Sequence, residues 1–69
     1  MKISARNQIA GTIKAVRKGA TTAHVEIEVG GGSVITASIT NEAVEQLKLA
    51  PGQKACAVIK ASDVMVGID

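Results

Sequence analysis

Two alternating segments joined by three glycines are the feature that most constrains this fold. Residues 22–29, TAHVEIEV, place every second residue on one apolar face: Ala23, Val25, Ile27 and Val29. Glycines at 30–32 can supply the positive φ angles that a tight hairpin needs. Residues 33–40, SVITASIT, alternate in the same way. The pattern predicts an antiparallel hairpin with one buried and one wet face.

Three further segments predict strands, at residues 9–17, 54–61 and 64–68. In the first of them, the alternation puts Ile9, Gly11, Ile13 and Ala15 on one face. A glycine at this point of a strand indicates a bend or a close approach of another backbone.

One short helix is expected at about 41–49, capped by Thr40 or Asn41. Its apolar stripe would consist of Ala43, Val44 and Leu47. A helix inserted among five short strands is the pattern of the OB fold, a five-stranded Greek-key barrel. We therefore predict an all-β protein whose residues 1–69 form one small OB-like barrel.

The chain is too short to be very stable by itself. With 69 residues and Cys56 as its one cysteine, it cannot form an internal disulfide or a zinc site of several cysteines. We interpret Cys56 as a small core residue. Hydrophobic residues make up 46% of the chain, and its mean hydropathy is +0.26. The surplus of apolar surface predicts a homo-oligomer.

The composition also limits the ligand. The chain contains no Phe, Tyr or Trp and carries a net charge of only +2, whereas single-stranded nucleic acids are bound by stacking on aromatic side chains. We therefore expect no nucleic-acid partner, and a small ligand held by hydrogen bonds and charge. The absence of a membrane-length apolar run and of a signal peptide, together with the lone thiol, predicts a cytoplasmic protein with no membrane partner.

Catalysis finds little support in the sequence. His24 is the only histidine and lies on the polar face of its strand, where a solvated role is the ordinary one. Glu26 and Glu28 also lie on that face, as solvated strand residues commonly do. The glycines at 30–32 join two strands and lack the Lys and following helix of a phosphate-binding loop. We predict that the protein is not an enzyme.

Hydrogen-bond donors gather in three stretches. These are residues 4–7 (SARN), the hydroxyls of residues 36, 38 and 40, and residues 60–62 (KAS). An oxyanion needs several convergent donors and positive charge, which Arg, Lys and hydroxyl side chains provide. Two alternatives remain open at this point: Thr is common on wet strand faces, and Lys60 could simply extend its charge into water from an apolar face.

Four segments together carry a family resemblance: MKISARNQ, KGATTAHVEIEV, GGGSVITASITNEAVEQL and AVIKASDVMVGI. They resemble the molbindins, the small molybdate-binding Mop proteins, whose sequence unit also occurs in molybdate regulators and in the ATPases of molybdate importers. The resemblance covers essentially the whole chain. It implies an OB-like barrel that assembles as a hexamer, a trimer of dimers, with oxyanion sites between subunits. It also implies cytoplasmic storage of molybdate, with tungstate as a competitor and no cofactor.

The resemblance also implies the roles of individual residues. One side of an intersubunit pocket would be formed by Ser4, Arg6, Lys60 and Ser62. Backbone or supporting bonds would come from Ala5, Asn7 and Ala61, and the neighbouring subunit would offer Thr36 and Ser38. A second oxyanion site near the symmetry axes would use Gly19, Ala20, Thr21 and Thr22. No side chain would ligate a bare metal cation.

Two other functions stay open from the sequence. The chain could be an OB-type module that binds nucleic acid, or an oligomerisation domain without a ligand. Binding to molybdate, sulfate and single-stranded DNA distinguishes the three.

Overall fold

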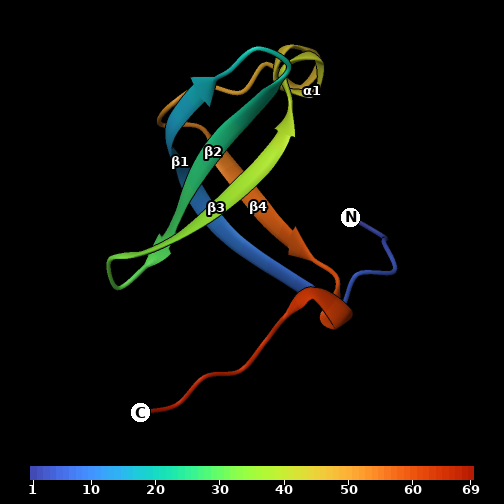
Figure 1. Cartoon of the computed structure of the whole chain (residues 1–69), viewed down its shortest axis with the longest axis vertical. Coiled ribbons are helices and arrows are strands. Elements are labelled where there is room, and N and C mark those ends of the chain that lie inside the picture. The colour runs from blue at the N-terminus through green and yellow to red at the C-terminus, as the bar shows by residue number, and fades with distance from the viewer.

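A computed structural model describes residues 1–69 and shows one curled antiparallel sheet with a short helix at one end (Figure 1). The elements in chain order are β1 (Asn7–Lys18), β2 (Thr22–Gly30), β3 (Ser33–Thr40), α1 (Asn41–Leu47), β4 (Lys54–Ile59) and the 3-10 turn η1 (Ala61–Asp63). The strand order is β3-β2-β1-β4. The predicted all-β class with one helix is confirmed.

The long strand β1 makes the sheet curl, because its two halves pair with different partners. Residues 7–12 pair with β4, and residues 12–18 pair with β2. At the change of partner lies Gly11, where an added Cβ would be 2.5 Å from the Glu28 carbonyl oxygen. Only a residue without a side chain permits β2 to approach this closely, as the sequence indicated.

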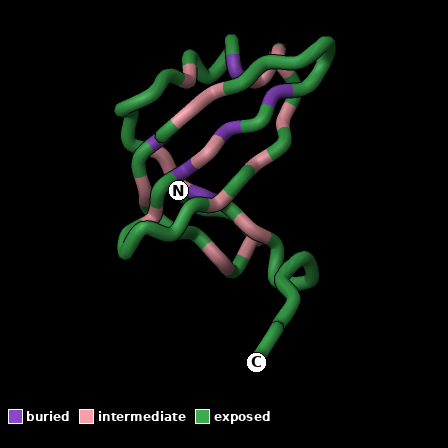
Figure 2. Tube along the Cα trace, turned by 60° about the vertical axis from the view of Figure 1, so that its left-hand side comes forward, coloured by how far each residue is buried: buried purple, intermediate pink, exposed green.

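The core lies inside the curl and is small. Six residues are buried (Figure 2): Ile13, Ala23, Val25, Ile27, Val44 and Ala57. The inward faces predicted for residues 22–29 and 33–40 are confirmed, because Ile35, Ala37 and Ile39 pack against this cluster. The face predicted for β1 is wrong beyond Ile13: a register shift before Ala15 turns Val16 toward the core instead.

The helix is shorter than predicted. Thr40 caps it, because the Ala43 N–H donates to the Thr40 hydroxyl oxygen over 3.0 Å. It ends at Leu47, since Lys48 adopts a left-handed conformation with φ of 54°. The expected apolar stripe is wrong at Leu47, whose exposure is 63%, and Leu49 packs on the core in its place.

Two expectations for the C-terminal part of the chain are wrong. Strand β4 ends at Ile59, and residues 64–68 form no fifth strand. The N–H groups of Asp63 and Val64 donate to the carbonyls of Lys60 and Ala61, which closes a turn and directs the tail away from β4 (Figure 1). Met65 and Val66 are more than 90% exposed. No helix has the length and apolar character needed to cross a membrane.

Within β4, the side chain that enters the core differs from the expected one. Cys56 is only half-buried, whereas its neighbour Ala57 is 5% exposed. The interpretation of Cys56 as a core residue is therefore wrong. The alternation of the strand places Ala57 inward and Cys56 toward an open groove.

Candidate functional site

The two donor-rich stretches at the ends of the chain meet in space. Asn7 pairs with Ile59 in the β1–β4 ladder, and the Asn7 side-chain amide donates to the Ile59 carbonyl over 3.3 Å. Residues 4–7 and 60–62 consequently lie together at the end of the sheet opposite α1 (Figure 1). The pairing connects positions 52 residues apart in sequence. Seven of the predicted site residues are therefore at one end of the sheet.

The side chains of Arg6, just before β1, and Gln8, in β1, bond to carbonyls of the N-terminal segment. The Arg6 guanidinium donates from Nε to the Ser4 carbonyl over 2.9 Å and from Nη2 to the Ile3 carbonyl over 3.4 Å. The Gln8 side-chain amide donates to the Ala5 carbonyl over 3.3 Å. The sequence prediction did not include Gln8, and no spacing rule signals a contact that depends on the conformation of this segment.

This end of the molecule carries positive charge that the chain does not neutralise. The ion pairs of the chain join Arg17 to Glu26 and Lys18 to Glu45, and neither involves Arg6 or Lys60. Both of these cations are exposed. The nearest carboxylate in the sequence, Asp63, also makes no ion pair. Uncompensated cations beside hydroxyl and amide donors suit an anionic ligand.

The side chains that could hold a bare metal cation are not grouped in this structure. The structure contains no group of three or more His, Cys, Asp or Glu side chains that could hold a metal ion. The donors of the candidate site are instead groups that bind the oxygen atoms of an anion.

The hydroxyls of β3 lie elsewhere in the same chain. Thr36 and Ser38 are exposed and alternate with the inward residues of β3. Their cross-strand neighbours are Glu26 and His24 on β2. Neither hydroxyl makes a hydrogen bond to residues 4–7 or 60–62 within the chain.

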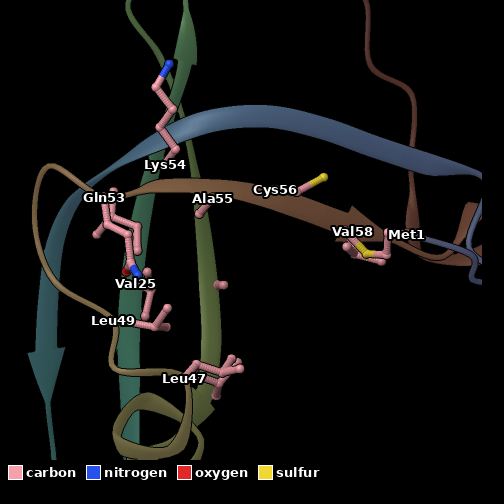
Figure 3. Close-up of a pocket in the computed structure, with 12 residues that line it drawn as sticks. Met1, Val25, Leu47, Leu49, Gln53, Lys54, Ala55, Cys56 and Val58 are labelled. Atoms are coloured by element: carbon pink, nitrogen blue, oxygen red, sulfur yellow. The ribbon is translucent and has the colours of Figure 1, made fainter.

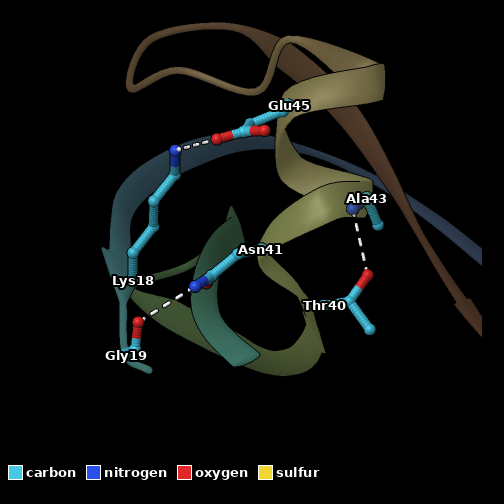
Figure 4. A network of polar contacts seen from close by, with 6 residues as sticks. All are labelled: Lys18, Gly19, Thr40, Asn41, Ala43 and Glu45. Carbon is cyan, nitrogen blue, oxygen red and sulfur yellow. Dashed lines mark hydrogen bonds and ion pairs between the residues drawn. The ribbon is translucent and has the colours of Figure 1, made fainter. Parts of the chain in front are cut away.

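The loop of the second predicted site, Gly19–Thr22, is held by Asn41 at the start of α1 (Figure 4). The Asn41 side-chain amide donates to the Gly19 carbonyl over 2.9 Å, and its backbone N–H donates to the Thr21 carbonyl over 2.9 Å. The Asn41 Oδ1 atom is buried and has no hydrogen-bond partner. Lys18 and Glu45 form an ion pair of 3.3 Å beside it. The sequence prediction included Asn41 only as a helix cap.

A third feature is an open apolar groove between β3, β4 and the segment after α1 (Figure 3). Ten of its twelve lining residues are hydrophobic, among them Leu47, Leu49 and Val58. Its polar lining residues are Gln53 and Lys54. A surface of this kind suits an apolar partner far better than an oxyanion.

The chain is similar to known proteins in sequence and in fold. The model of the TOBE domain family matches residues 3–66. The probable molybdenum-pterin-binding protein of Haemophilus influenzae is 45% identical over 69 residues, which are the whole of both chains. The structure of a molybdate-binding protein from Sporomusa ovata is 37% identical, with a TM-score of 0.91 over 99% of this chain and 100% of that chain.

A third protein is similar over part of its length. The molybdate-bound structure of the cytoplasmic molybdate-binding protein ModG is 46% identical, with a TM-score of 0.93, and the match covers 100% of this chain and 49% of that chain. The matches in sequence and in fold agree with the resemblance to the Mop proteins. The chain belongs to the TOBE domain family, within which its full-length relatives are small molybdenum-pterin-binding proteins.

Proposed function

We propose that this protein binds molybdate, and tungstate in competition with it, at sites between subunits, and thereby stores or buffers the oxyanion in the cytoplasm. The observation that carries the proposal is the meeting of residues 4–7 with residues 60–62 at one positively charged end of the sheet. The names of its relatives support molybdate as the ligand. The chain acts in this proposal as a binding protein without a catalytic step.

The chemistry of the site fits a tetrahedral dianion. Arg6 and Lys60 supply two positive charges, while the hydroxyls of Ser4 and Ser62 supply neutral donors. Hydrogen bonds in which one partner is charged are about twice as strong as neutral ones. Thr36 and Ser38, which lie far along the sheet order in the same chain, complete the site from a neighbouring subunit. The Gly19–Thr22 loop is a second, independent oxyanion site in the same proposal.

Calorimetric titration of the wild-type protein tests the ligand. We expect molybdate and tungstate to bind with micromolar or lower dissociation constants, because a dianion held by several charge-assisted hydrogen bonds replaces its water shell with matched donors. Sulfate is smaller and is expected to bind more weakly. A single-stranded DNA oligonucleotide is expected not to bind, because the chain has no aromatic side chain for stacking.

Two outcomes of this titration contradict the proposal. Tight binding of the oligonucleotide without molybdate binding favours the nucleic-acid module. If none of these ligands binds, the result favours an oligomerisation domain without a ligand.

The assembly is part of the same proposal, and the uncovered apolar surface supports it. Only six residues of the chain are buried. Met65, Val66 and Ile68 are each more than 90% exposed, and the groove of Figure 3 is open. We therefore place the tail and the groove in contacts between subunits of a homohexamer. Oligomerisation is a common way to stabilise a domain of this size.

Sedimentation velocity tests the assembly. The ligand-free wild-type protein is expected to sediment as a hexamer. Deletion of residues 64–69 is expected to give an assembly of fewer subunits, because the deletion removes exposed apolar side chains but no buried residue. Ala50→Ser changes an exposed residue outside the tail, the groove and β3 and serves as the control. A stable wild-type monomer at micromolar concentration contradicts the assembly.

A further inference from the structure

The two free edges of the sheet border the apolar groove. The strand order β3-β2-β1-β4 leaves β3 and β4 each without a partner on one side. The groove lies between these two strands and is lined from both of them, by Ala37 and Ile39 of β3 and by Ala55 and Val58 of β4 (Figure 3). Free edges beside an apolar groove form a place where one more strand can be added.

The tail after η1 has the residue pattern of such a strand but no partner in its own chain. Apolar branched side chains alternate there with other residues: Val64, Val66 and Ile68 with Met65, Gly67 and Asp69. Val66 and Ile68 are more than 90% exposed, and no backbone N–H of residues 65–69 donates a hydrogen bond within the chain. The turn at η1 directs the tail away from its own groove (Figure 1).

We propose that two copies of the chain exchange their tails, so that residues 64–69 of each copy lie in the groove of the other, antiparallel to β4. A reciprocal exchange of identical segments closes as a symmetric dimer and leaves no open groove. The inference rests on the assembly in the proposed function, to which it adds the segment that fills the groove, its direction and its register.

Charge selects the register of this pairing. Lys54 begins β4 at the rim of the groove, is exposed and makes no ion pair. Asp69 is also exposed and makes no ion pair. Opposite charges that face each other across two strands attract. If Lys54 faces Asp69 of the second copy, antiparallel pairing places Ala57 opposite Val66.

The alternation of both strands agrees with this register. Residues that are opposite in an antiparallel pair lie on the same face of the sheet. Val66 and Ile68 then lie opposite Ala57 and Ala55, which face the core, and these small side chains leave room for branched ones. A shift by one residue would turn Asp69 to the inward face and the branched side chains outward. Charge and burial therefore select the same register independently.

The exchange also brings donor groups of two chains together. In the proposed register, Val64 of one copy lies opposite Ile59 of the other, and Val64 follows Ser62 by two residues. Ile59 is paired with Asn7 of its own chain. The charged end of each sheet thus lies beside η1 of the second copy, which places residues 60–62 of one chain beside residues 4–7 of the other.

The chain's only cysteine allows a direct test. Cys56 lies opposite Gly67 of the second copy in this register, and opposite residues of antiparallel strands have the Cα separation of a disulfide. Gly67→Cys should therefore run mostly as a dimer on a non-reducing denaturing gel after mild oxidation. Val66→Cys is the matched control and should remain mostly monomeric, because residue 66 lies on the other face. In the single chain, no atom lies within 4 Å of a Cβ added at Gly67.

Charge reversal provides a second test without a new cysteine. Lys54→Glu sets like charges opposite each other at two places in the symmetric dimer, so we expect its dissociation constant in sedimentation to rise about tenfold. The double variant Lys54→Glu/Asp69→Lys has the net charge of wild type and should regain the wild-type dissociation constant. Failure of the double variant to do so would contradict the pairing of these two residues.

Three results of the cysteine experiment would overturn the exchange. A disulfide within one Gly67→Cys chain would mean that the tail returns to its own groove. Equal cross-linking of the two cysteine variants, or none in either, would mean that the tail does not lie in this register. Calorimetry with molybdate tests the proposed function separately. A cross-linked dimer without molybdate binding in wild type contradicts that function alone, whereas molybdate binding without the cross-link contradicts the exchange alone.

Discussion

Lys60→Gln should weaken molybdate binding by at least about tenfold, because it removes one of two uncompensated cations from the end of the sheet where the donors meet. Lys60 makes no ion pair or side-chain hydrogen bond within the chain, so the substitution breaks no contact of the fold. The measurement is the dissociation constant at two salt concentrations. The dissociation constant of the variant should depend less on salt concentration than that of wild type, since one charge fewer faces the dianion.

Lys14→Gln is the matched control for this prediction. Lys14 is also exposed and also makes no ion pair, but it lies at the irregularity of β1, away from the paired ends of β1 and β4. Lys14→Gln therefore lowers the net charge of the protein as much as Lys60→Gln does, but it removes no charge from the candidate site. Equal loss of affinity in the two variants would mean that net charge alone attracts the anion, and wild-type affinity in Lys60→Gln would remove Lys60 from the site.

The two strands of the β2–β3 hairpin and their inward faces could be predicted from strict alternation and a glycine turn, but the register shift between Glu28 and Gly30 could not. The face of β1 could not be predicted, since the shift before Ala15 is set by how β1 pairs with β2 and leaves no mark in its own residues. Residues 64–68 have the composition of a strand. A strand, however, needs a neighbour to pair with, and the turn at Ala61–Asp63 leads them away from the sheet.

The candidate site could likewise be predicted only in part. Arg6 and Lys60 are expected in the site from the family resemblance, and their positive charge is what a dianion needs. The pairing of Asn7 with Ile59, which brings the two stretches together, follows from the register of β1 and β4. Asn41 and Gln8 could not be assigned from the sequence, because each acts on the carbonyls of a loop whose conformation only the folded chain defines.

The second large effect concerns stability. Gly11→Ala should lower the free energy of unfolding by about 2–3 kcal/mol, at the upper end of what overpacking costs. The added Cβ would lie 2.5 Å from the Glu28 carbonyl oxygen and 2.8 Å from Ile27 Cγ2. The first of these is a backbone atom of β2, so relief requires a shift of one strand against the other. Thermal unfolding at fixed protein concentration measures the effect, with an expected decrease in the midpoint of about 10–20 °C for a domain of this size.

Ala10→Ser is the control, because Ala10 precedes Gly11 in β1 and is exposed. It should leave the midpoint nearly unchanged. An unchanged midpoint in Gly11→Ala would contradict the close approach of β1 and β2. Because Gly11 lies where β1 changes partner, a shift of β2 there also moves the paired ends of β1 and β4. We therefore expect Gly11→Ala to weaken molybdate binding as well as folding, although residue 11 is not part of the candidate site.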